Sequence, residues 1–314
     1  MNRLFRQCLG AALLGLGGLL AQAWAYELNG FRLDAASVPP ADIHPGGPPR
    51  DGIPAIDRPV FIPASEATHL KPADRILGVE WLGIARAYPI NILNWHEVVN
   101  DRFGDDAVVV TFCPLCGTGM AFGARIGGRD FQFGVSGLLY NSDVLLYDRQ
   151  TESLWSQIMT KAISGPMRGQ RLIFLPTSHT TWGEWIRRHP KSEVLSPDTG
   201  YARDYGRDPY AGYRESADVM FPVAIRDGRL HPKEQVIGLS LGGEHKAYPF
   251  SALSRSTGKA VEDRVGGQRV RIEFDPEART GRVFDAQGRE IPSLIAFWFA
   301  WLAFHPETAL YDAR

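Results

Sequence analysis

Cys113 and Cys116 are the residues of this chain whose type and spacing could most clearly do chemistry. They lie in the segment 111–122, which reads TFCPLCGTGMAF. Two intervening residues keep the sulfurs close enough to share a metal or to form a disulfide. A third cysteine, Cys8, lies in an N-terminal segment that we expect to be removed. The remaining pair could be a local disulfide, a redox dithiol or a metal clamp, and it cannot form a disulfide framework.

A second copy of this segment, EFDPEARTGRVF at 273–284, lacks the cysteines. Asp275 stands in place of Cys113 and Ala278 in place of Cys116. Two more pairs of segments recur in the same order, ILGVEWLGIARAYPI (76–90) with VIGLSLGGEHKAYPF (236–250), and WGEWIRRHP (182–190) with WFAWLAFHP (298–306). Three matches in order indicate a duplication. Features that only one copy carries are therefore candidates for chemistry rather than for scaffold.

The five residues 113–117, CPLCG, resemble the knuckle of rubredoxins and zinc ribbons. In those families the turn aims backbone N–H groups at the sulfurs, which favours thiolates and hence a metal. They use two knuckles and four cysteines, whereas this chain has one knuckle. Histidine, methionine, carboxylate, water or a second subunit would have to supply the missing ligands. The resemblance implies a bound metal, whose identity the sequence leaves open, with zinc and copper as the candidates.

Candidate further ligands can be sorted by comparing the copies. His96 corresponds to Ser256 and His179 to Ile295, so both histidines are specific to the first copy. Met120 could offer a thioether to Cu(I), although it equally suits an apolar position on a strand. A cysteine nucleophile with a histidine base is a further possibility. A structural disulfide in the tight turn is the alternative without chemistry, and its short loop would stabilise the fold only slightly.

A different class of function is suggested by the polar and aromatic segment 134–157, which the second copy lacks. The candidate substrate-binding residues there are Tyr140, Asn141, Asp143, Asp148 and Trp155. Two carboxylates could act as general acid and base on a glycan, with tryptophan as a stacking platform. Acids in such a loop are also common as turn and cap residues.

The elements that position these residues can be predicted from local patterns. Residues 108–112 form a β-rich run, CPLCGTG reads as a turn and 120–126 as the returning strand. A helix is expected after Tyr88-Pro89, and another over 182–189 with Thr180 or Thr181 as its N-cap. A thioredoxin-like site would place the cysteines at a helix N-terminus, which this pattern disfavours. We therefore predict a strand-rich α+β fold built on a duplicated hairpin–helix unit and unlike thioredoxin.

The expected organisation starts with a signal peptide at 1–25, because Arg3 and Arg6 precede a short apolar run that ends in small residues. A Pro/Gly-rich arm (26–70), a first repeat (71–225, with an insert at about 134–180) and a cysteine-free second repeat (226–314) follow. We expect a periplasmic or secreted protein that is not membrane-bound after cleavage.

The charge of the chain narrows the list of partners. The 34 basic and 35 acidic residues nearly balance, and no basic run stands out. Nucleic acid is therefore excluded as an expected partner. The remaining expected partners are a redox protein, a metal-delivery protein or a small-molecule ligand, and whether the chain is an enzyme stays open.

The line AYPI…HEVVND…VVVTFCPLCGTGMAF…GVSGLLYNSDVLLYDRQTESLW resembles a prokaryotic exported family catalogued as a domain of unknown function. The resemblance covers roughly residues 70–310, and TFCPLCGTG is its most specific part. It implies one exported family domain. It implies no activity and no catalytic role for any residue.

Overall fold

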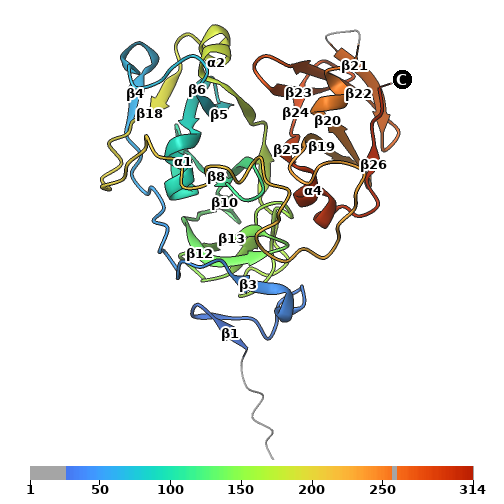
Figure 1. Cartoon of the computed structure of the whole chain (residues 1–314). Coiled ribbons are helices and arrows are strands. Elements are labelled where there is room, and N and C mark those ends of the chain that lie inside the picture. The colour runs from blue at the N-terminus through green and yellow to red at the C-terminus, as the bar shows by residue number, and fades with distance from the viewer. Residues whose placement is uncertain (1–25, 257–259, 314) are drawn as a thin grey trace, which may run out of the picture.

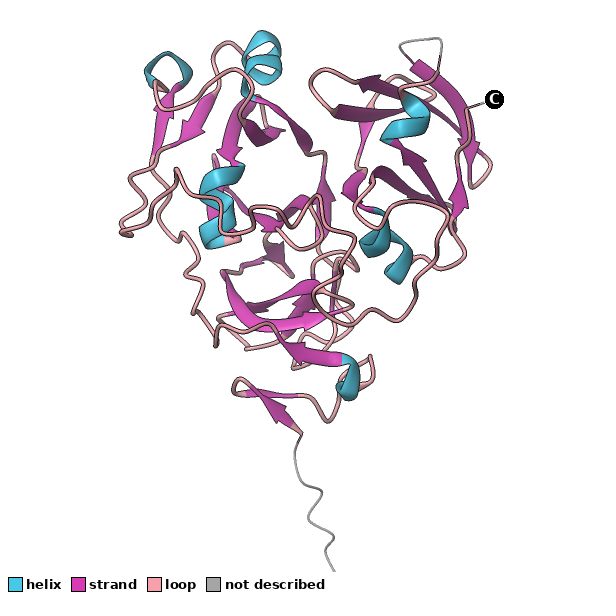
Figure 2. Ribbon diagram, viewed as in Figure 1, coloured by secondary structure: helices cyan, strands magenta, loops and turns pink. Residues whose placement is uncertain are grey.

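The computed structural model describes residues 26–256 and 260–313. The predicted signal peptide therefore lies outside the described residues. Strands account for 42% of the structure and helices for 11%, and five sheets of four or five strands form a five-bladed β-propeller arrangement (Figures 1 and 2). None of the described helices is long and apolar enough to cross a membrane.

The first repeat supplies three of the sheets. Blade 1 has the order β17 (Ser178–Thr181), β5 (Arg75–Trp81), β6 (Ile84–Pro89), β18 (Glu193–Leu195) and β4 (Phe61–Pro63). Blade 2 has the order β16 (Ile173–Leu175), β9 (Thr118–Gly123), β8 (Asp106–Cys113) and β7 (Val98–Phe103). Blade 3 has the order β15 (Lys161–Ala162), β14 (Leu154–Ser156), β13 (Asp143–Asp148), β12 (Phe133–Tyr140) and β3 (Ile43–Pro45).

The second repeat supplies the other two sheets. Blade 4 has the order β25 (Leu294–Phe297), β19 (Gln235–Leu241), β20 (Glu244–Pro249) and β26 (Ala309–Leu310). Blade 5 has the order β21 (Ala260–Val265), β22 (Gln268–Asp275), β23 (Thr280–Asp285) and β24 (Glu290–Ile291). Two-stranded ribbons pair β1 (Glu27–Leu28) with β2 (Phe31–Arg32), and β10 (Arg125–Ile126) with β11 (Arg129–Asp130). Residues 26–70 also contribute strands β3 and β4, which form the outer edges of blades 3 and 1 respectively.

The helices are short and lie at strand ends (Figure 2): α1 (Ile90–His96), α2 (Trp182–Arg188), α3 (Phe250–Leu253) and α4 (Trp298–Phe304). Helix α1 begins after Pro89, and α2 begins after Thr181, whose hydroxyl accepts the Glu184 N–H as an N-cap. Both helices were expected from the sequence.

The predicted α+β class is wrong. Each hairpin of the repeats has two edges with unpaired backbone groups, and these groups must find partners. They find them far along the chain: β17 pairs with β5 through Ser178 and Gly78, and β18 adds to β6 in parallel. These pairings turn the hairpins into complete sheets. Local hydrophobic periodicity does not reveal them, because it reports only which face of a strand is buried.

The matched segments of the two repeats make the same contacts. The Trp185 ring packs against Gly78, and the Trp301 ring packs against Gly238 in the same way. Each tryptophan stacks on the histidine four residues later, with ring centroids 4.1 Å apart for the first pair and 4.0 Å for the second. His189 and His305 are the two histidines, so their role is packing at a helix end.

Each repeat packs one of its strands against a hairpin of the other repeat. Strand β25 of the second repeat packs against β9 of the first, and β17 of the first packs against β23 of the second. In both contacts, the end strand of one repeat covers the hairpin of the other. The turn that carries the cysteines therefore lies at the junction of the repeats.

Candidate metal or thiol site

The cysteine turn joins β8 to β9, as the sequence predicted, and faces the second repeat. Cys113 ends β8 and pairs with Thr118, and the Gly117 N–H donates to the Pro114 carbonyl. The Phe297 N–H of β25 donates to the Cys116 carbonyl oxygen at 2.8 Å. Both cysteines are buried and carry free thiols.

A second hairpin brings a carboxylate to the sulfurs. Asn141 and Ser142 form the tight turn between β12 and β13, each with a positive φ, and Asp143 begins β13. The Cys116 thiol donates to the Ser142 carbonyl oxygen at 3.3 Å, and the Cys113 sulfur lies 3.9 Å from the same oxygen. The two sulfurs and a carboxylate oxygen of Asp143 all lie within 4.8 Å of one another. Cys113, Cys116 and Asp143 therefore form a buried group that could hold a metal ion.

Burial dominates the electrostatics of this group. It raises the pKa of Asp143 to about 7, against hydrogen bonds from the Ile158 N–H and the Ser156 hydroxyl that lower it. The pKa of the Cys116 thiol is raised well above its usual value by burial and then by the neighbouring Cys113 and Asp143. Without a cation, the site therefore favours a protonated Cys116.

Glu97 is a further buried carboxyl group near the site that the sequence analysis missed. It ends α1 in the left-handed conformation, and its carbonyl accepts the Phe112 N–H from β8. Burial raises its pKa to about 8, a hydrogen bond from Tyr210 lowers it, and the charge of Asp143 raises it further. Its position directly after His96 was the only hint in the sequence.

Several buried polar atoms have no hydrogen-bond partner within the described part of the chain: Ser142 Oγ, Asp143 Oδ1, Gln157 Oε1 and the Tyr213 hydroxyl. Buried polar groups are nearly always paired in proteins, so each of these atoms indicates a missing partner. Asp143 Oδ1 belongs to the group itself. Burial raises the pKa of Tyr213, and the charges of Cys116 and Cys113 raise it further.

The covering segment over this site is 197–216, the Tyr-, Arg- and Asp-rich stretch between the repeats. Tyr213 and Tyr210 line a pocket of about 90 Å³ together with Phe112 and Pro114 of the cysteine hairpin. Lys233 holds the segment in place by donating to the carbonyls of Tyr213, Ser216 and Asp218.

The predicted histidine ligands lie outside the Cys–Cys–Asp group. His96 uses both ring nitrogens elsewhere, bonding the Pro54 carbonyl at 2.8 Å and the Tyr205 hydroxyl at 2.7 Å. His179 is buried on β17 beside Phe112, with ring centroids 6.0 Å apart. Met120 is buried on β9, where it borders a separate cavity with His245 and His305.

The predicted substrate-binding residues are mostly engaged within blade 3. Trp155 is fully buried, and its indole N–H donates to Asp148, which also accepts from Thr151. Asn141 bridges to the Ala303 carbonyl and the Ala224 N–H, and Tyr140 packs against Phe304. Asp143 alone of this set joins the cysteines.

The comparison with protein families decides where this chain belongs. Residues 50–308 match the model of a family described as a protein of unknown function (DUF3179). The chain belongs to this family. No curated protein and no solved structure matches it. The matched region includes all of the group Cys113, Cys116 and Asp143, so this family membership covers the site but describes no activity for it.

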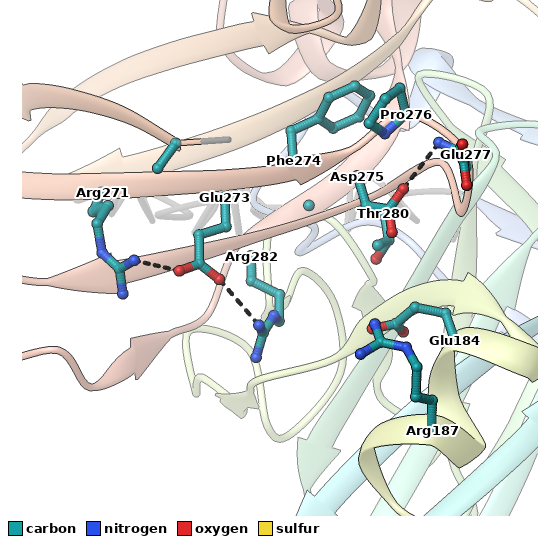
Figure 3. Close-up of a pocket in the computed structure, with 12 residues that line it drawn as sticks. Glu184, Arg187, Arg271, Glu273, Phe274, Asp275, Pro276, Glu277, Thr280 and Arg282 are labelled. Carbon is teal, nitrogen blue, oxygen red and sulfur yellow. Dashed lines mark hydrogen bonds and ion pairs between the residues drawn. The ribbon is translucent and has the colours of Figure 1, made fainter. Parts of the chain in front are cut away.

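A larger cavity of about 630 Å³ lies between α2 and the hairpin of β22 and β23. Its side chains are mostly charged, and Figure 3 shows how they pair: Glu273 accepts from Arg271 and from Arg282. Arg187 lies 3.6 Å from Glu184 on α2. Because these charges already satisfy one another, the cavity offers less unmet binding chemistry than the smaller site at the cysteines.

Proposed function

We propose that Cys113, Cys116 and Asp143 bind a transition-metal ion, zinc or copper. The observation that carries this proposal is the convergence of two thiols and a carboxylate oxygen within 4.8 Å of one another. The unpartnered Asp143 Oδ1 adds to it, because a bound cation would satisfy that buried atom. The second repeat builds the same turn with Asp275 and Ala278, so the turn itself does not require the sulfurs.

The donor set suits a soft or borderline ion. Thiolates select Cu(I) and zinc over magnesium or calcium. Zinc takes sulfur at about 2.3 Å and carboxylate oxygen at about 2.0–2.2 Å in a tetrahedral arrangement, so three atoms spaced as closely as these can serve one ion after small side-chain movements. A fourth position would be left for water, for Glu97 or for a ligand entering past Tyr213.

Metal binding is better supported than thiol–disulfide exchange. Exchange requires an accessible thiolate, and a raised thiol pKa slows it. Here both sulfurs are buried, and the pKa of Cys116 is raised well above its usual value. A metal cation reverses this balance by stabilising the thiolates.

The glycan alternative has weaker support. A stacking platform for a sugar must present an open aromatic face, and Trp155 is fully buried. Asp148 is occupied by the Trp155 indole and by Thr151.

Export is part of the same proposal. The basic and apolar N-terminal segment predicts a periplasmic or secreted protein, in which a metal-delivery or redox partner would serve the site. Sequencing the N-terminus of the mature protein tests this part, and an intact Met1 on protein recovered from the cytoplasm would contradict it.

Metal analysis tests the site directly. Protein purified under reducing conditions should contain about one equivalent of zinc or copper per chain, as expected for a single three-residue site. Cys113→Ser/Cys116→Ser and Asp143→Asn should lose the metal. Asp148→Asn is the matched control, because it changes a buried carboxylate on the same strand that does not face the sulfurs. Metal-free protein with its cysteines bridged and resistant to mild reductant would refute the proposal, whereas a bridge that cycles readily would favour exchange.

A further inference from the structure

Three arginines meet at the junction of the repeats, where the Arg214 guanidinium lies over the Phe297 ring. Arg75 extends from β5, Arg279 occupies the turn between β22 and β23, and Arg214 lies in the covering segment. We call these three residues the arginine cluster. Arg75 joins the repeats by donating to the carbonyls of Ala278, Arg279 and His179.

The hydrogen-bond donors of this cluster are only partly used: Arg279 donates from Nε and Nη2 to Gln235 Oε1. Within the described part of the chain, no carboxylate forms an ion pair with any of the three guanidinium groups. Burial, and then the charges of Arg214 and Arg279, lower the pKa of Arg75 to about 10. Burial, and then the charge of Arg279, lower the pKa of Arg214, while Glu215 and Asp208, which line the same pocket as Arg214, raise it in part.

His179 is the buried neighbour of the cluster. It is almost fully buried, and neither of its ring nitrogens has a hydrogen-bond partner among the described residues. Burial and the nearby arginines lower its pKa well below the usual value, so the ring is neutral and offers one N–H donor. The second repeat places Ile295 at the equivalent position, so the fold does not require a polar side chain there.

The equivalent turn of the second repeat has an arginine where the first repeat has a glycine. Arg279 is the counterpart of Gly117, and both residues have a positive φ. Phe297 packs on Gly117, and its counterpart in the first repeat is the smaller Thr181. The equivalent turns thus present different chemistry, sulfur in the first repeat and a guanidinium in the second.

We propose that the arginine cluster and His179 form a binding site for a small oxyanion group, a carboxylate, phosphate or sulfate. Planar guanidinium groups recognise such groups with paired charge-assisted hydrogen bonds. Arg214 borders the pocket that also contains Phe112 and Pro114, which places the anion site beside the cysteine turn. This site is distinct from the proposed metal site and does not depend on it.

Calorimetric titration of the full-length mature protein with sodium phosphate, sulfate and acetate, each in separate runs, tests this proposal and distinguishes the anion classes. At least one anion should bind saturably with about one site per chain, and Arg214→Gln and Arg279→Gln should each weaken it roughly tenfold or more. Arg279→Lys should recover only part of the affinity, because an ammonium lacks the fork of donors. Arg187→Gln on α2 removes an equally positive but exposed side chain and is the matched control.

Circular dichroism and the melting temperature of each variant separate lost binding from lost folding. Folded Arg214→Gln and Arg279→Gln proteins with wild-type affinity would overturn the proposal. So would the absence of saturable binding by all three anions, or an equal loss of affinity in Arg187→Gln. Metal content should stay unchanged in the arginine variants, so failure of the anion site and failure of the metal site give different results.

Discussion

At the scale of single residues, two buried positions carry a thiol or an imidazole in the first repeat and an apolar side chain in the second repeat. Cys116 corresponds to Ala278 and His179 to Ile295, and all four side chains are buried. Burying a polar group without a partner costs free energy, so a residue that only filled space would be better apolar. This comparison supports the proposed binding role of His179 most directly, because its ring nitrogens have no hydrogen-bond partner among the described residues, whereas the Cys116 thiol donates to the Ser142 carbonyl.

The affinity for zinc should rise with pH because Asp143 must lose its proton to become a ligand. Below its pKa of about 7, the metal has to displace that proton, so affinity falls as the pH falls. The protonated Cys116 thiol adds to the same trend. Competition titrations at about pH 6 and about pH 8 should show at least a tenfold difference. The slope should persist in Asp148→Asn, and an affinity independent of pH would contradict the ligand assignment.

Replacing His179 by isoleucine, as in the second repeat, should leave the free energy of unfolding within about 1 kcal/mol of the wild type or raise it. The change removes two unpartnered buried nitrogens, which offsets the lost contact with Phe112. The same variant should bind the anion more weakly. Denaturant unfolding and anion titration measure the two effects, and a stability loss of several kcal/mol with unchanged binding would assign His179 a structural role instead.

At the scale of elements, two hairpin turns assemble the candidate metal site. The CPLC turn is tight because Gly117 takes a positive φ and lies under the Phe297 ring, where a Cβ would come within 2.8 Å of a ring carbon. The Asn141–Ser142 turn of the adjacent blade aims Asp143 at the sulfurs. Neither hairpin alone holds a complete ligand set.

Gly117→Ala should destabilise the protein by about 2–4 kcal/mol, from backbone strain and from the clash with Phe297. It should also lower metal occupancy by shifting Cys116. Gly128→Ala is the control: Gly128 has a similar positive φ with nothing near its Cβ position, so it should cost only about 1 kcal/mol. Thermal or denaturant unfolding gives the comparison, and equal losses would show that Phe297 does not fix the turn.

At the scale of the whole molecule, each repeat packs an end strand against the other repeat, and we call this pair of contacts the clasp. The end strands β17 and β25 each cover the hairpin of the opposite repeat, so the two equivalent turns lie at the junction of the repeats. The two turns carry different side chains, with sulfurs in one turn and Arg279 in the other. The junction therefore concentrates both candidate sites between the repeats.

Metal binding in the first repeat should consequently protect the second. The Phe297 N–H donates to the Cys116 carbonyl, so fixing the cysteine turn should slow exchange of that amide. Hydrogen exchange of the peptide containing β25, with and without added zinc, measures this effect. The outer strand β21 is the internal control and should change little. Protection confined to the first repeat would contradict a coupling through the clasp.

Local sequence patterns predicted the cysteine hairpin and the helices α1 and α2, because strand and cap signals act over a few residues. They did not predict the blades, since β17 reaches β5 across most of the first repeat. The sequence suggests Asp143 as a glycan-binding residue and not as a partner of the cysteines. Its approach depends on the packing of blade 3 beside blade 2, which no spacing in the sequence records.

The sequence by itself determined that this protein is duplicated, that one copy carries a cysteine pair in a turn, and that the turn forms without sulfur. These are properties of neighbouring residues and of direct comparison between the copies. Only the tertiary structure decided that Asp143 and the two thiols converge, that His96 is committed elsewhere, and that three arginines meet without a carboxylate ion-pair partner among the described residues. Side chains far apart along the chain meet only when the sheets pack, because the burial that shifts their pKa values and removes their water partners exists only in the folded molecule.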